Sequence, residues 1–197
     1  MQHQSVAITQ KPETDPVSLA ELKDHLRFDE FDDGSQDNLL TRLIKSATGM
    51  VELETRRALI ERTLRLSLDA WPSGRGVVYL PEPPTLEVVA IDYDDVDGVA
   101  QTLATDQYQV DLNATPARIA PVDCWPETLC GVLAPIRIDL RAGFGDTRAD
   151  VPDDLRHAVL LTAGHFYENR EATSTTQLHA VPLAVATLLE PYRIPLV

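Results

Sequence analysis

The stretch Thr63-Leu64-Arg65-Leu66-Ser67-Leu68-Asp69 decides the fold, because apolar and polar residues alternate along it. Successive side chains of a β-strand point to opposite faces, so the alternation predicts a strand with one buried face. Further strands are predicted at 77–80, 86–93, 108–112, 117–120 and 135–142. Asp97-Gly98 predicts a hairpin turn, since glycine accepts the positive φ that such turns need.

Helical periodicity flanks this β segment on both sides. Upstream, Ser18-Leu19-Ala20-Glu21 is typical of a capping box at the start of a short helix. A longer helix is predicted over 36–57, with Ser35 as a possible cap and Leu43 as a core position. Its apolar stripe consists of Leu39, Leu40, Leu43, Ile44, Ala47, Met50, Val51 and Ala58. Downstream, a helix is predicted from Pro152 to 168–170, and a short one over 182–189.

These signals predict an α+β fold in which a mostly antiparallel β domain is inserted between two halves of a helical bundle. The helical halves are expected to pack together, because neither could bury its apolar stripe alone. The predicted division is an extended N-terminal arm at 1–16, the first half of the bundle at 17–60, the β domain at 61–148, the second half at 149–192, and a C-terminal tail at 193–197.

The charge of the chain limits the classes of function. Its 197 residues include 17 Lys and Arg but 31 Asp and Glu, a formal net charge of −14. Such a surface repels duplex DNA, and a basic groove-reading helix is missing, so a protein that grips DNA is not expected. A protein that surrounds DNA with a negatively charged surface would still let the DNA slide through. No apolar run approaches the ~20 residues of a membrane span, and the start of the chain lacks the features of a signal peptide. Synthesis and folding in the cytoplasm are therefore expected.

Motifs that carry chemistry are weak in this sequence. The acidic cluster at 92–98 fits a calcium loop at too few ligand positions, so an acidic hairpin is predicted there. His157, His165 and Glu168 lie on one predicted helix, and a metal-dependent hydrolase using them is one alternative. A monomeric acidic binding module is another. Because no nucleophile motif accompanies these residues, we predict neither an enzyme nor a cofactor.

The C-terminal tail is expected to be extended, because Pro191 and Pro195 prevent a helix from continuing through it. Its residues are Arg193, Ile194, Pro195, Leu196 and Val197. The apolar side chains of this tail could fold back onto their own chain or lie against another one. The second interpretation makes the tail a candidate partner-binding segment.

Four stretches of the chain, taken in order, carry a family resemblance. They are Pro16-Val17-Ser18-Leu19-Ala20-Glu21-Leu22-Lys23-Asp24-His25-Leu26-Arg27, Leu59-Ile60-Glu61-Arg62-Thr63-Leu64, Leu80-Pro81-Glu82-Pro83-Pro84-Thr85-Leu86 and His165-Phe166-Tyr167-Glu168-Asn169-Arg170-Glu171. In order and spacing they resemble the head–tail connector (adaptor) proteins of tailed phages and gene transfer agents. The resemblance covers residues 16–193.

The resemblance implies a structural protein that forms a ring, dodecameric in typical members. The ring would lie between the capsid portal protein and a stopper or tail-terminator protein, with DNA passing through it without specific binding. It implies assembly in the cytoplasm and then a place at the head–tail junction of a virion or phage-like particle. It favours contact of the tail with the portal or a neighbouring subunit, and it marks the motif from His165 to Glu171 as a helix end or interface.

Overall fold

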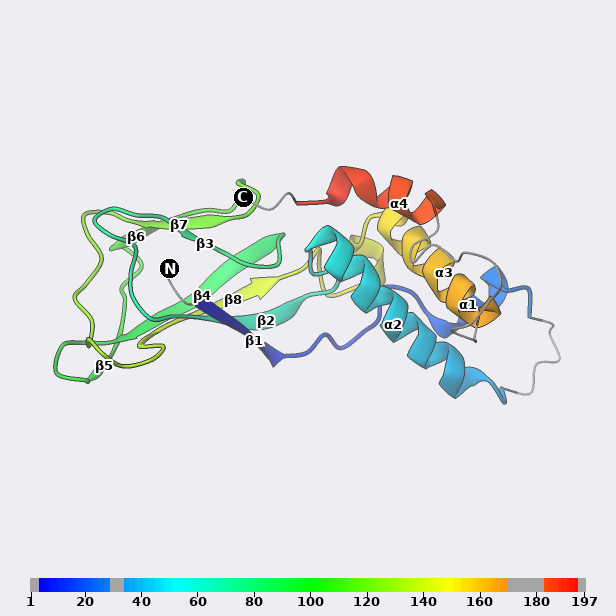
Figure 1. Ribbon diagram of the computed structural model, residues 1–197, viewed down its shortest axis with the longest axis horizontal. Helices are drawn as coiled ribbons and strands as arrows, with labels where there is room; N and C mark the ends of the chain where they lie inside the picture. Colours follow the sequence, from blue (N-terminus) through cyan, green and yellow to red (C-terminus); the bar gives the residue numbers. More distant parts are fainter. Residues whose placement is uncertain (1–3, 29–33, 170–182, 195–197) are drawn as a thin grey trace. The chain divides into compact units, whose positions relative to one another are not determined.

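The structure is a computed structural model that describes residues 4–28, 34–169 and 183–194. It has an α+β fold, and every strand pair among the described residues is antiparallel. The chain forms two compact units, whose elements are labelled in Figure 1. The β unit comprises Met1–Pro12 and Glu61–Phe144, and the helical unit comprises Glu13–Ile60 and Gly145–Val197. The predicted α+β class with antiparallel sheets is confirmed.

The larger sheet of the β unit has the strand order β1-β2-β8-β4-β5. Its strands are β1 (Gln4–Gln10), β2 (Arg62–Leu68), β8 (Ile136–Ala142), β4 (Thr85–Asp94) and β5 (Ala100–Thr102). In β2 and β8 every second residue is buried, as the alternation predicts. Leu64 lies opposite Leu140, and Leu66 lies opposite Ile138. The two strands therefore present one continuous apolar face to the core.

The second sheet consists of β3 (Val78–Tyr79), β7 (Arg118–Pro121) and β6 (Tyr108–Asp111), in the order β3-β7-β6. A tryptophan pair packs in the same unit. The rings of Trp71 and Trp125 are parallel, with centroids 4.1 Å apart. The indole N–H of Trp125 donates to the carbonyl of Gly76 at 2.8 Å. This bond satisfies the polar group of a nearly buried ring.

The N-terminal segment differs from the expected extended arm. Residues Gln4–Gln10 form strand β1, which pairs with β2 so that Val6 faces Leu66 and Ile8 faces Leu64. Val-Ala-Ile-Thr is a run with high β-propensity, and β2 offers it a free edge. The sequence predicts an arm there, because the segment is largely polar and Pro12 and Pro16 follow it. In the structure all seven residues of the strand are exposed.

The helical unit contains α1 (Leu19–His25), α2 (Asp37–Thr55), α3 (Asp153–Glu168) and α4 (Leu183–Leu189), with 3-10 turns at Arg148–Asp150 and Glu190–Tyr192. The predicted capping box starts α1. The hydroxyl of Ser18 accepts from the backbone N–H of Glu21, and the carboxylate of Glu21 accepts from that of Ser18. The same carboxylate accepts from Arg156 of α3. Helix α2 packs against α3, and α3 packs against α4. No helix among the described residues is long and apolar enough to cross a membrane.

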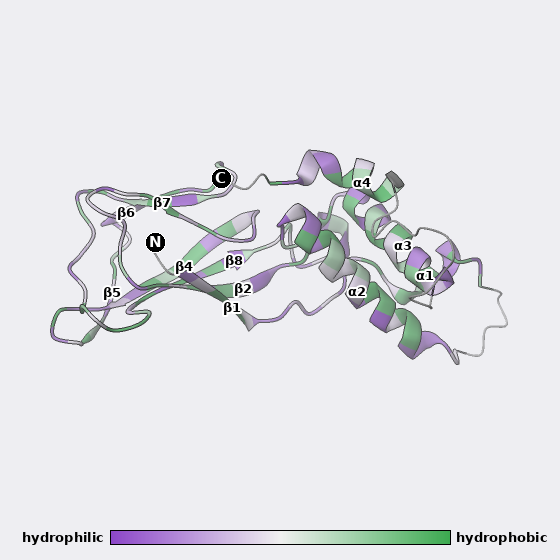
Figure 2. Ribbon diagram, in the orientation of Figure 1, coloured by the Kyte–Doolittle hydropathy of each residue, from purple (hydrophilic) through white to green (hydrophobic). Residues whose placement is uncertain are grey.

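Helix α2 buries a narrower stripe than the sequence predicts, and residues of opposite hydropathy alternate around it in Figure 2. Its fully buried positions are Leu40, Ile44, Ala47, Val51 and Thr55. Leu43 is partly exposed, because it lies on the flank of this seam. Buried Thr55 donates its hydroxyl hydrogen to the carbonyl of Val51 at 2.7 Å. The residue at the N-cap is Gln36, so the expectation that Ser35 caps the helix is wrong.

Candidate interaction surfaces

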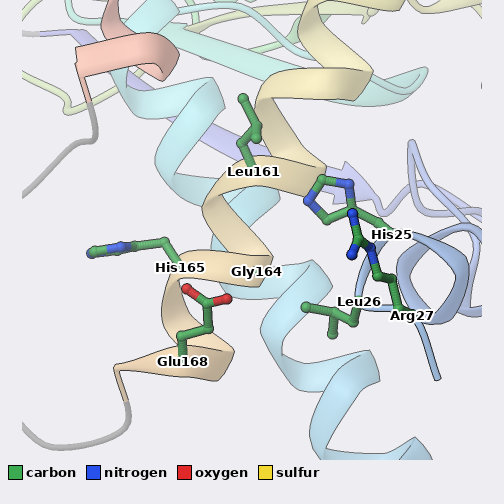
Figure 3. Close-up of a pocket in the computed structure, with 7 residues that line it drawn as sticks. All are labelled: His25, Leu26, Arg27, Leu161, Gly164, His165 and Glu168. Atoms are coloured by element: carbon green, nitrogen blue, oxygen red, sulfur yellow. The ribbon is translucent and has the colours of Figure 1, made fainter.

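The family-motif residues lie at the C-terminal end of α3. His165 and Glu168 line a cavity of about 430 Å³ there, shown in Figure 3. Across it lie residues from the end of α1, among them His25 and Arg27. The cavity therefore combines basic and acidic side chains from two helices that are far apart in the sequence. Arg170 and Glu171 of the motif lie outside the described residues.

Other motif residues are used within the chain. The hydroxyl of Tyr167 donates to the side-chain carbonyl of Gln36 at 3.0 Å, and its ring meets Phe28 edge-on at 5.8 Å. The side chain of Asn169 donates to the carbonyl of His165 at 2.9 Å and lies 3.2 Å from a nitrogen of the His165 ring. The hydrogen bond of Tyr167 fixes the end of α3 against the residue that precedes α2, and the contacts of Asn169 lie within the end of α3. In the motif, His165 and Glu168 are the described side chains that line the cavity.

The structure does not gather the residues of the metal hypothesis into one site. The ring of His157 packs edge-on against His25, with centroids 6.3 Å apart, while His165 contacts Asn169. Across the described ranges, no three His, Cys, Asp or Glu side chains are grouped so that they could hold a metal ion. The proposed set of His157, His165 and Glu168 is therefore wrong as a metal site.

The root of the C-terminal tail is fixed to its own chain. Arg193 forms an ion pair with Glu54 of α2 at 2.8 Å and a second one with Glu190 at 3.3 Å. Arg57 donates to the carbonyl of Tyr192 at 2.7 Å. Ile194 is partly exposed. The other predicted partner-binding residues, Pro195, Leu196 and Val197, lie outside the described residues.

The acidic hairpin between β4 and β5 uses its carboxylates locally. Asp95 accepts from the backbone N–H groups of Asp97 and Val99 at 3.0 and 2.9 Å, which closes the turn. Asp94 forms a bidentate ion pair with Arg137 of β8, at 2.7 and 3.1 Å. These bonds account for two carboxylates of the cluster as structural groups. The prediction of an acidic hairpin at this position agrees with the geometry.

We expect the β unit to lose stability in acid through this ion pair. Hydrogen bonds from Arg137 hold the pKa of Asp94 below its usual value of 3.8. A carboxylate whose pKa is lowered by folding stabilises the native state above its unfolded pKa and loses that effect as pH falls through the lowered one. In the Asp94→Asn variant, the midpoint of unfolding is therefore expected to decrease less steeply than in the wild type as the pH falls below 3.8.

The matched control for this prediction is Asp97→Asn, which removes a charge from the same turn and leaves the Asp94–Arg137 pair in place. Chemical denaturation at a series of pH values gives the midpoints. Equal acid dependence of the wild type and the Asp94 variant would show that this pair does not contribute.

Exposed apolar side chains are concentrated in the β unit, and no motif in the sequence marks them. They include Val6, Ile8, Val89, Val96, Val99, Val110, Leu112, Val122, Val132 and Leu133. Val6 and Ile8 stand out, because they lie next to buried residues on a regular strand. Their spacing of two residues is the signal that could have identified β1.

Comparison with known proteins gives a consistent result. No family model and no curated protein matches the chain. Solved structures of gene transfer agent (GTA) particles match nearly all of it, among them the following three. A chain of the neck of an empty GTA particle, computed with C6 symmetry, has a TM-score of 0.81 and 29% identity, over 98% of this chain and 97% of that one. A chain of the virion of a native GTA particle gives 0.81 and 29%, over 98% and 96%. A chain of the neck of a native GTA particle, computed with C12 symmetry, gives 0.77 and 29%, over 98% and 97%.

The class of protein follows from these matches. The chain is similar over nearly its whole length to chains of GTA particles, two of them from structures of the neck. This confirms the resemblance to the head–tail connector family and the prediction that the protein has a structural, non-enzymatic role. Virion assembly in a phage-like particle is the setting that the likeness supports.

Proposed function

We propose that this protein is a head–tail adaptor. Copies of it form a ring between the portal protein of a capsid and a stopper or tail-terminator protein, and the DNA path runs through the ring. The observation that carries the proposal is the likeness to GTA neck structures over 98% of the chain, with a TM-score of 0.81. A local likeness could reflect a shared domain, whereas this one includes both units.

The symmetry of the similar structures supports a ring. Neck structures that contain a similar chain were computed with C6 and with C12 symmetry. Rotational symmetry of this kind arises when one surface of each subunit meets a different surface of the next. Twelve copies are our proposal for the ring of this chain. They assemble in the cytoplasm and remain at the head–tail junction of the particle.

The acidic charge fits a passage for DNA. The net charge of −14 gives the ring little attraction for phosphates, so DNA can move through without being held. The sequence has two concentrations of acidic residues, at 29–33 and at 92–97. The one at 29–33 lies outside the described residues, and the other is the β4–β5 hairpin.

The four helices of the described chain are proposed to act as one bundle that carries the partner-binding residues. Helix α1 packs against α2 and α3, and α2 and α3 each pack against α4. The proposed interface at the end of α3 consists of His165, Tyr167, Glu168, Asn169, Arg170 and Glu171. The cavity lined by His165 and Glu168 is the part of it that a partner side chain could enter.

The tail from Arg193 to Val197 is proposed to contact the portal or an adjacent subunit. The ion pair of Arg193 with Glu54 of α2 supports this, because it holds the first residue of the tail in a defined position. The apolar residues beyond that point are Ile194, Leu196 and Val197, and their burial against a surface would lower the free energy of the assembly.

Deletion of residues 194–197 tests this proposal. The deletion keeps Arg193 and its ion pair with Glu54, so we expect an unchanged thermal unfolding midpoint. We also expect the truncated chain to lose binding to the portal protein by about tenfold or more, the equivalent of about 1.4 kcal/mol. Co-sedimentation with portal rings and electron microscopy of the products measure this.

The matched control is removal of residues 1–3 from the other end. A shortened tail that lowers the unfolding midpoint but still joins the portal would show that the tail folds back onto its own chain. A full-length chain that neither binds portal rings nor forms rings would contradict the adaptor function itself.

A further inference from the structure

The outer edge of β1 is open in this structure. Strand β1 is the first strand of the larger sheet and pairs with β2 on one side. Among residues 4–28, 34–169 and 183–194, no strand pairs with its other side. The backbone N–H and C=O groups that point outward from such a strand can accept a further strand from another chain.

From Gln4 to Ile8 this edge lacks the devices by which proteins normally prevent such pairing. The strand reads Gln-Ser-Val-Ala-Ile-Thr-Gln, with no charged residue, no proline and no glycine. Its pairing with β2 is regular from Gln4 to Ile8, and one register shift follows between Ile8 and Gln10. In contrast, β4, which β5 covers only from Asp92 to Asp94, has two irregularities in its register and an exposed Glu87. Bulges and charges protect an edge, so β4 is protected along most of its length, whereas β1 lacks such protection from Gln4 to Ile8.

The apolar face of the sheet also continues onto β1 without cover. Val6 lies opposite Leu66 and Ile8 opposite Leu64, and directly opposed residues share a face. Leu64 and Leu66 are buried, whereas Val6 and Ile8 are 42% and 46% exposed. An added strand would cover part of both side chains and pair the free backbone groups at once.

We infer that β1 pairs edge to edge with β5 of a second copy of this chain, so that the larger sheets of neighbouring subunits join. This inference rests on the proposed ring. The similar chains occur in assemblies with C6 and C12 symmetry, in which adjacent subunits meet through different surfaces. Two β1 strands therefore cannot pair with each other in the ring, and β1 must meet a different edge.

Strand β5 is the edge that fits best. It ends the same sheet on the opposite side, and its residues Ala100, Gln101 and Thr102 are uncharged and exposed. The preceding Val99 is 54% exposed, which gives Val6 or Ile8 an apolar neighbour. Strand β3 is two residues long, and β6 ends in Asp111, which is paired with Arg118. Strand β3 is thus the shortest of these edges, and β6 carries a charged residue whereas β5 carries none.

Hydrogen exchange of the full chain, free and assembled into rings, tests the inference directly. In the free chain alternate amides of β1 point away from β2 and exchange fast. We expect these amides, and those of β5, to exchange about tenfold or more slowly in the ring. A ring in which β1 exchanges as in the free chain would overturn this inference and leave the adaptor function standing. Protection of β1 by the portal protein with β5 unchanged would also overturn it.

A pair of double variants provides the second test. Val6→Lys with Ile8→Lys places charges on the proposed interface, and we expect about tenfold less ring formation with an unchanged unfolding midpoint. Val132→Lys with Leu133→Lys changes two exposed apolar residues of the same unit by the same charge and is expected to assemble normally. Equal loss in both variants would overturn the inference, because charge alone would explain it. A chain that forms no ring, alone or with its portal protein, would overturn both the inference and the proposed function.

Discussion

Ile44→Ala is expected to destabilise the helical unit by about 2–5 kcal/mol, the range for removing most of a buried aliphatic side chain. Ile44 lies in the seam that α2 buries and is 2% exposed. The loss has two parts, the transfer free energy of the deleted methyl groups and the cavity they leave behind. Urea denaturation followed by helical circular dichroism measures it.

The control for this prediction is the neighbouring residue on the same helix. Leu43→Ala removes a side chain of the same size from a partly exposed position and is expected to cost about 1 kcal/mol. Equal losses at the two positions would show that the buried seam of α2 has been misplaced.

The second large effect is expected in the β unit. Trp125→Ala removes one ring of the parallel pair with Trp71 and the hydrogen bond to Gly76, and we expect a loss of about 3–5 kcal/mol. Trp125→Phe keeps an aromatic ring for stacking but no N–H donor. The phenylalanine variant is expected to lose less stability than the alanine variant. About 1 kcal/mol of its loss comes from the missing hydrogen bond, and the smaller ring accounts for the rest of that loss.

Chemical denaturation followed by far-ultraviolet circular dichroism measures both tryptophan variants. A change of less than about 1 kcal/mol for the alanine variant would show that the pair contributes little to the β unit, since surface substitutions fall in that range. The wild-type chain offers an additional readout. Its two tryptophans, Trp71 and Trp125, both belong to the β unit, so their fluorescence reports the unfolding of that unit.

The sequence predicts most of the regular elements, because they follow local rules. The capping box of Ser18 and Glu21 is a local pattern of hydrogen bonds, and the structure confirms it. The alternation in β2 and β8 reflects burial on one face, so it identifies the strands without knowledge of their partners. Such elements can be predicted because the signal lies within a few residues of the chain.

The remaining features depend on contacts between distant segments. Strand β1 is exposed along its whole length, so its local signal is limited to the spacing of Val6 and Ile8, and its pairing with β2 cannot be deduced locally. The partial exposure of Leu43 depends on the direction from which α3 packs against α2. The cavity beside His165 needs the ends of two helices to meet. Of the tail, the sequence indicates the apolar character, but not the ion pair of Arg193 with Glu54.

The order in which the chain visits its two units has a consequence for synthesis on the ribosome. The chain starts in the β unit, passes to the helical unit, returns, and ends in the helical unit. Strand β1 must wait for β2, and α2 must wait for α3, because each pairs with a segment made much later. A chain released early therefore lacks part of at least one unit and exposes its unfinished apolar faces to chaperones and proteases. A prematurely terminated chain therefore does not reach the folded state of both units.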